Sequence, residues 1–201
     1  MKKVLAIGLV SLALAQAKVF IGVQGGYDLG GLLTKTGGLD APIWAGNTTG
    51  GWSVGANLGV EHGSGFLGLR YFLSFDYSRS LQGVSASSKN FSAYDVDLNV
   101  DIMLNLIRGS SLGLGLFAGA GAGYQYISFA DTANNRLYSD GNIPIFGRAG
   151  VTLRFGERIR VDAGVKIPIM AFDMLKYRNA PAGDAHYYAP LKIQGSIRFL
   201  F

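Results

Sequence analysis

The feature that most constrains the fold is an alternation of apolar with polar or small residues, which returns in eight separate segments. The clearest is residues 94–104, where Tyr, Val, Leu and Ile at even positions alternate with Asp95, Asp97, Asn99 and Asp101. Side chains that alternate with a period of two lie on opposite faces of a β-strand. The same pattern covers residues 19–29, 52–61, 67–77, 112–126, 143–155, 159–169 and 187–201. The chain is therefore expected to be all-β.

The connections between these predicted strands alternate in length. Residues 30–50, 79–90, 130–141 and 173–184 are long and polar or Gly-rich, whereas residues 61–65, 105–111 and 156–158 are short. Long loops at one end, tight turns at the other and an even strand number are typical of bacterial outer-membrane barrels. We therefore expect an eight-stranded antiparallel up-and-down transmembrane β-barrel, with both mature termini in the periplasm.

The number and size of the apolar side chains indicate which face of the barrel contacts lipid. A soluble barrel such as a lipocalin would place the apolar face inside, but roughly six large apolar side chains per strand exceed the capacity of an eight-stranded lumen. The opposite face contains many of the 30 glycines and suits a narrow interior. The apolar face is therefore predicted to point outward into lipid. Aromatic residues mark the expected rims, with Tyr27, Trp52, Phe75, Tyr77, Tyr94, Tyr124, Tyr126 and Tyr187 near the long loops and Phe155, Phe199 and Phe201 near the short turns.

The first residues have the features of a secretory signal peptide. Lys2 and Lys3 precede an apolar run from Val4 to Ala15, which is too short for a membrane helix, and an A-x-A site ends at Ala17. Residues 1–17 are predicted to be removed, so that residues 18–201 form the barrel in the outer membrane of a Gram-negative bacterium. The chain has no Cys, which excludes disulfides and a cysteine nucleophile.

Charged residues on the predicted inner face form a candidate site. Acidic residues concentrate in segment 94–104 and basic residues in the last three segments, and the Gly-rich inner face of segment 112–126 leaves room for them to meet across the lumen. Confined charges must be paired or hydrated. The predicted lumen charge network is Arg70, Asp95, Asp97, Asp101, Arg148, Arg154, Arg160, Asp162, Lys166, Lys192 and Arg198, with Arg70 and Asp101 at similar depth on neighbouring strands. It acts either as a rigid polar plug or as the wall of a thin ion channel.

No catalytic, cofactor-binding or metal site is expected. His62 and Ser64 have a spacing that a barrel lipid hydrolase could use, but they lie in a predicted tight turn, and His186 lies at the edge of a long loop. The Gly series from Gly113 to Gly123 lies within a strand and is interpreted as lumen packing, not a nucleotide loop. The net charge of +5 is small and dispersed, so nucleic acid is not an expected partner.

Three segments resemble the Helicobacter outer-membrane protein family. Residues 66–77 (FLGLRYFLSFDY) resemble its GLRYY-x-F-x-DY strand, residues 114–119 (LGLFAG) its GLFAG strand, and residues 161–168 (VDAGVKIP) its ELGIKIP strand. The resemblance implies one membrane domain shared by porins and adhesins, here without the long receptor-binding region that precedes these motifs in larger adhesins. The ending at Phe199 and Phe201 resembles the aromatic signal read by the barrel-assembly machinery.

Two functions remain open at this point. The first is a non-enzymatic integral outer-membrane protein with a structural or surface-interaction role through its long loops. The second is a small porin or ion channel through the charged lumen. Expected partners are outer-membrane lipids, the barrel-assembly machinery and an extracellular ligand of unknown identity.

Overall fold

The computed structural model describes residues 17–29, 32–36, 50–63, 65–81, 91–131, 136–173 and 184–201. The predicted signal peptide lies outside this part of the chain except for Ala17. Over the described ranges, no helix is long and apolar enough to cross a membrane.

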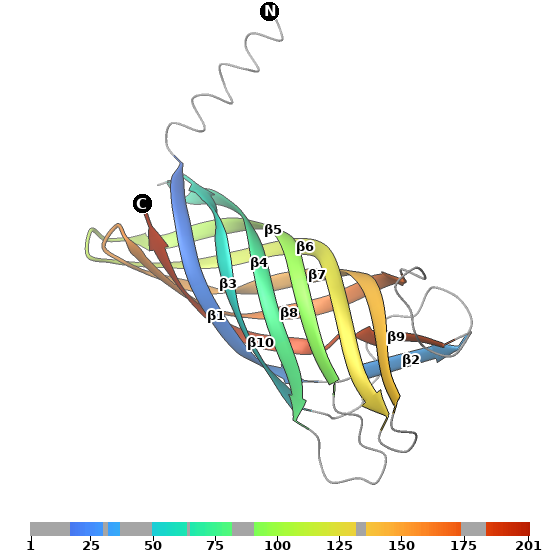
Figure 1. Cartoon of the computed structure of the whole chain (residues 1–201). Coiled ribbons are helices and arrows are strands. Elements are labelled where there is room, and N and C mark those ends of the chain that lie inside the picture. The colour runs from blue at the N-terminus through green and yellow to red at the C-terminus, as the bar shows by residue number, and fades with distance from the viewer. Residues whose placement is uncertain are drawn as a thin grey trace, which may run out of the picture.

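Strands make up nearly all of the described chain, and eight of them close into an antiparallel barrel in the order β1-β10-β8-β7-β6-β5-β4-β3 (Figure 1). Strands β2 and β9 pair separately. The strands are β1 (Lys18–Leu29), β2 (Leu32–Thr36), β3 (Gly50–His62), β4 (Leu67–Leu81), β5 (Phe91–Arg108), β6 (Leu112–Asp131), β7 (Arg136–Phe155), β8 (Ile159–Asp173), β9 (Asp184–Tyr188) and β10 (Leu191–Leu200). The predicted eight-stranded antiparallel barrel is confirmed.

The barrel closes because β1 pairs with both β3 and β10, so that Phe20 lies opposite Gly59 on one side and Leu200 on the other. The register can be followed from Gly22 on β1 to β6 in both directions around the barrel. Through β3, β4 and β5, the residue of β6 that is reached is Gly123, and through β10, β8 and β7 it is Gly113. The offset from residue 113 to residue 123 is the stagger of a closed barrel. For eight strands it corresponds to a tilt of about 40° from the barrel axis.

The two ends of the barrel differ. One end, here called the turn end, carries the tight connections around residues 63–66, 109–111 and 156–158, and Lys18 and Phe201 also lie there (Figure 1). Gly63 and Gly156 have φ values of 95° and 59° in two of these turns, a left-handed conformation that favours glycine. The other end, here called the loop end, carries the longer connections and the β2–β9 sheet.

The alternation predicted from the sequence separates two surfaces. On β5, the side chains of Asp95, Asp97 and Asp101 are at most 1% exposed, whereas Leu98 is 66% exposed. The exposed side chains of all eight barrel strands are predominantly apolar, and the buried ones include most of the charges. The apolar face therefore points outward, as the bulk argument predicted.

Three details of the sequence interpretation are wrong. The segment 130–141 is not a long loop, since β6 continues to Asp131 and β7 begins at Arg136. The last barrel strand begins at Leu191, and Tyr187 belongs to β9 in the two-stranded sheet. The strands also run beyond the apolar pattern, and β6 and β7 each reach 20 residues against the roughly 9–11 that a membrane requires. Where a hairpin extends into water, backbone pairing continues without a lipid-facing alternation to mark it.

Candidate functional site in the barrel lumen

The centre of the lumen is built around Arg70 of β4, which is fully buried. Its Nη2 lies 2.6 Å from Oδ2 of Asp101 on β5, and its Nη1 lies 2.8 Å from Oδ2 of Asp162 on β8. Because β5 and β8 lie on different sides of the barrel, this one guanidinium bridges the lumen. The predicted neighbouring pair of Arg70 and Asp101 forms.

Two further arginines share the same carboxylates. Nε of Arg148 on β7 lies 3.3 Å from Oδ1 of Asp101, and Arg198 of β10 pairs with Asp162. Three guanidiniums thus surround two carboxylates, and the remaining positive charge needs other stabilisation.

Aromatic rings inside the barrel stabilise the remaining positive charge of the arginines. Phe72 of β4 is 3% exposed, and its ring centroid lies 4.7 Å from Cζ of Arg148 and 4.9 Å from Cζ of Arg198. Phe117 of β6 lies 5.1 Å from Cζ of Arg70, and Phe20 of β1 lies 5.2 Å from Cζ of Arg198. A cation over a ring face is attracted by the ring quadrupole, most strongly when both are desolvated. The sequence pattern placed Phe72 and Phe117 on the inner face, but their role with the arginines was not predicted.

The loop-end half of the lumen pairs acids with lysines. Nζ of Lys166 on β8 lies 2.6 Å from Asp97, and Nζ of Lys192 on β10 lies 3.0 Å from Asp95. Lys192 also donates to Ser78 at 2.8 Å and lies 4.0 Å from Asp28. Asp28 on β1 was not in the predicted network, and Asp76 on β4 was predicted to face inward but was not included in that network; both are buried.

At the turn end, Arg160 pairs with Glu61 and donates to Thr152. Glu61 was not in the predicted network, although the alternation of residues 52–61 placed it on the inner face, and β3 continues one residue further to His62. Arg154 is not brought into the network: its Nη2 donates to the backbone carbonyl of Gly109 at 3.2 Å.

The lumen charges are therefore sorted along the barrel axis. Among the described residues, the loop-end half contains Asp28, Asp76, Asp95, Asp97 and Asp140 with Lys166 and Lys192, and the turn-end half contains Arg70, Arg148, Arg154, Arg160 and Arg198 with Glu61, Asp101 and Asp162. This polarity gives the lumen an acidic loop end and a basic turn end.

Glycines of β6 make room for these side chains. A Cβ at Gly119 would lie 2.4 Å from Oδ1 of Asp101, and a Cβ at Gly123 would lie 2.4 Å from Oδ1 of Asp97. The Gly-rich inner face thus admits the carboxylates of the neighbouring strand, as expected from the sequence. One cavity between the described side chains, lined by Gln24, Phe117, Arg148 and Asp162 among others, has a volume of about 10 Å³, which is close to the minimum for one water molecule.

Tyr188, at the end of β9, covers the loop end of the lumen. Its hydroxyl donates to Oδ2 of Asp28 at 2.5 Å, and its backbone N–H donates to Oε1 of Gln125 at 3.2 Å. Its ring lies 5.7 Å from Nζ of Lys192. Burial and the neighbouring Asp28 raise the pKa of Tyr188, so the phenol remains a hydrogen-bond donor. The β2–β9 sheet is thereby attached to the barrel mouth (Figure 1).

The histidine candidate has a different position from the one expected. His62 is not in a turn but ends β3 opposite Leu69, and its Nε2 lies 2.5 Å from the hydroxyl of Tyr71. Ser64 and the side chain of His186 lie outside the described part of the chain. Within that part, no three His, Asp or Glu side chains are grouped so that they could hold a metal ion.

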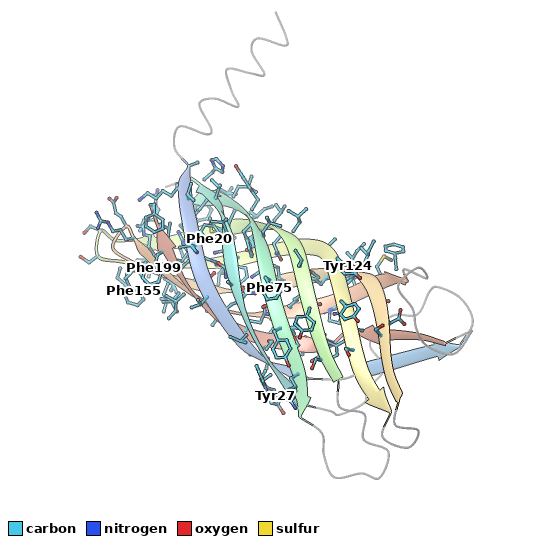
Figure 2. The ribbon with its side chains drawn as sticks, in the orientation of Figure 1. Phe20, Tyr27, Phe75, Tyr124, Phe155 and Phe199 are labelled. Carbon is cyan, nitrogen blue, oxygen red and sulfur yellow. The ribbon has the colours of Figure 1, made fainter. Side chains whose placement is uncertain are left out.

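The outward aromatic residues follow the two ends of the barrel. Tyr27 and Tyr124 lie towards the loop end, and Phe155 and Phe199 towards the turn end (Figure 2). Phe199 and Phe201, the predicted assembly signal, are 48% and 78% exposed at the end of β10.

A closed eight-stranded antiparallel barrel with an apolar outer face and a charged lumen defines an outer-membrane β-barrel protein. The family model described as Helicobacter outer membrane protein matches residues 54–192, and the chain belongs to this family.

Solved structures with a similar fold include three bacterial barrels. Neisserial surface protein A, from Neisseria, is 13% identical over 92% of this chain and 99% of that one, with a TM-score of 0.49. Ail, the attachment invasion locus protein of Yersinia pestis, is 14% identical over 90% and 98%, with a TM-score of 0.43. The N-terminal β-barrel domain of Pseudomonas aeruginosa OprF is 11% identical over 92% and 100%, with a TM-score of 0.42. No curated protein sequence matches the chain.

Proposed function

We propose that this protein is a non-enzymatic outer-membrane barrel whose lumen is closed, and that it serves a structural or surface-interaction role through its loop end. The observation that carries the proposal is the bridge from Arg70 on β4 to Asp101 on β5 and Asp162 on β8, buried at the centre of the barrel. A barrel blocked at its centre offers no aqueous path, so its function would reside in its ends.

The proposed orientation places the loop end outside the cell and both mature termini in the periplasm. The even number of barrel strands and the tight connections at the turn end support it, because outer-membrane barrels have short periplasmic turns and longer extracellular loops. Export would depend on residues 1–17 as a signal peptide, and insertion on the barrel-assembly machinery acting at Phe199 and Phe201. An extracellular ligand of the loops is part of the same proposal.

The alternative function is a small ion channel. The sorting of acids towards the loop end and arginines towards the turn end favours it, because separated charges line the walls of selective pores. Even so, the bridge from Arg70 to Asp101 and Asp162 favours closure, and the cavity beside Arg148 and Asp162 is only about 10 Å³.

Planar-bilayer recording of the refolded full mature chain separates the two functions. We expect silent membranes at protein loads that give steady steps with a general porin used as positive control. Reproducible unitary conductance from this protein would contradict the closed barrel and establish the channel.

A further inference from the structure

The described part of the lipid-facing surface carries one charged side chain, at the loop end of β4. Among the described outward-facing side chains of the eight barrel strands, Arg79 of β4 is the only permanently charged one; the others are apolar or uncharged. Arg79 is exposed and pairs with no other described side chain, unlike the arginines at the centre of the lumen. An unpaired charge on the lipid-facing side of a barrel is tolerated only near the headgroups.

Arg79 lies within a group of aromatic side chains at the loop end. In the strand register it is opposite Trp52 on β3, and it follows Tyr77 by two residues on the same face of β4. The rings of Trp52 and Tyr77 meet edge-on with centroids 5.6 Å apart, and those of Tyr77 and Tyr94 lie 5.1 Å apart.

These rings form an aromatic belt, defined as Tyr27, Trp52, Tyr77, Tyr94 and Tyr126. Tyr27 pairs in register with Trp52, Tyr77 with Tyr94, and Tyr94 with Tyr126, so the belt is continuous across β1, β3, β4, β5 and β6. Towards the loop end of β7, β8 and β10, the outward positions are Ile143, Phe172 and Leu191, which have no polar group. The belt is therefore one-sided, with Arg79 at its middle strand.

The loop sequences at the same end are basic. The residues that connect the barrel strands at this end, 30–49, 82–90, 132–135 and 174–190, contain Lys35, Lys89, Lys176 and Arg178 and two acids, Asp40 and Asp184. A positive balance of this kind favours an anionic surface as the partner of this end.

We propose that Arg79, Trp52 and Tyr77 form a binding site for the phosphorylated sugar headgroup of an outer-leaflet glycolipid. The planar guanidinium binds a phosphate through two parallel hydrogen bonds, and the rings, with an apolar body and a polar tip, pack against the sugar at the headgroup level. The proposal rests on the orientation given above, since only the outer leaflet presents such a lipid to the loop end.

The fluorescence of Trp52, which belongs to the proposed site, reports binding of the lipid. The chain has two tryptophans, so Trp44→Phe leaves Trp52 as the only one. This variant is refolded in detergent micelles and titrated with bisphosphorylated lipid A, and Trp52 emission is followed. We expect a saturable shift, an affinity about tenfold lower after Arg79→Gln, and partial recovery with Arg79→Lys.

Arg158→Gln in the turn after β7 serves as the matched control, because it removes the same charge from the opposite end, and its titration should be unchanged. Phosphatidylglycerol in the same micelles supplies a phosphate without the sugar and should bind more weakly. Equal affinities before and after the Arg79→Gln substitution, or equal binding of the two lipids, would overturn the proposal. If Trp44→Phe fails to fold, native mass spectrometry of the chain that retains Trp44, with the same lipids, replaces the titration.

Failure of this site and failure of the proposed function give different results. Conductance in a bilayer would refute the closed lumen but would leave the micelle titration unchanged. Loop-end labels that react only from the periplasm would refute the orientation, again without changing the titration.

Discussion

At the scale of single residues, the lumen shows why charges can be kept inside a membrane barrel. Arg70 has both carboxylate partners within 3 Å and aromatic rings of Phe72 and Phe117 within 5.6 Å of its Cζ. Buried ions are costly unless the geometry of pairing is good, and removing one partner leaves the others uncompensated.

Arg70→Met is therefore expected to lower the free energy of unfolding by about 3 kcal/mol, because Asp101 and Asp162 each lose a buried partner. Urea unfolding in detergent micelles, followed by gel mobility, measures this. Lys18→Gln removes an exposed pair with Glu157 and should cost less than about 0.5 kcal/mol. Similar midpoints for the two variants would show that the Arg70 bridge contributes little.

The glycines of the barrel offer a second residue-level comparison. Gly119→Ala places a methyl group 2.1 Å from the carbonyl of Val100 and 2.4 Å from Asp101, so we expect a loss of about 1–3 kcal/mol from overpacking. At Gly147 the nearest atom to an added Cβ is 3.7 Å away, and Gly147→Ala should be close to neutral. The urea unfolding midpoints of the two variants measure this difference. An unchanged midpoint for Gly119→Ala would show that the lumen has room for the added methyl group.

At the scale of elements, the β2–β9 sheet is attached to the barrel through Tyr188, which donates hydrogen bonds to Asp28 and Gln125. Tyr188→Phe removes the donor to Asp28, and the amides of β9 should exchange hydrogen about tenfold faster. Tyr27→Phe, on the outer face nearby, should leave this exchange unchanged. If β9 exchange is the same in both variants, Tyr188 is not the attachment point.

The same attachment should be insensitive to pH over the neutral and mildly alkaline range. A raised pKa keeps the Tyr188 phenol protonated, so the stabilisation is fully present below the usual tyrosine pKa and is lost only as pH rises through the folded value. Exchange of β9, corrected for the intrinsic rate, should thus be flat from about pH 6 to pH 9.

The sequence predicted the barrel strands well because lipid outside and a narrow lumen inside impose a period of two on the chain. It did not predict β2 and β9, or the extension of β6 and β7 through residues 130–141, because these segments do not carry the regular alternation of apolar and polar residues that lipid imposes. For the lumen, the alternation of inward and outward residues placed Arg70 and Asp101 at similar depth on neighbouring strands. Contacts across the barrel, such as that of Arg160 with Glu61, depend instead on the stagger of the closed sheet. No local pattern in one sequence reveals that stagger.

At the scale of the whole molecule, closure of the barrel depends on its last strand. β10 pairs with both β1 and β8, and the backbone N–H of Phe201 donates to the carbonyl of Val19. If Phe199 and Phe201 are the assembly signal, deletion of Phe201 should reduce the outer-membrane level several-fold, as measured by membrane fractionation and heat-modifiable gel mobility. Phe155→Ala, which removes an exposed aromatic at the same end, is the control.

Closure of the lumen is tested most directly by cysteine accessibility, because the chain has no Cys of its own. Ser74→Cys places a thiol at a 5% exposed position in mid-lumen with almost no change in size, and Ser111→Cys places one in an exposed turn. With a charged methanethiosulfonate reagent, the thiol at position 111 should react within minutes, whereas the thiol at position 74 should react only after unfolding. Rapid modification at position 74 in the folded barrel would show a water-filled path through the lumen and contradict its closure.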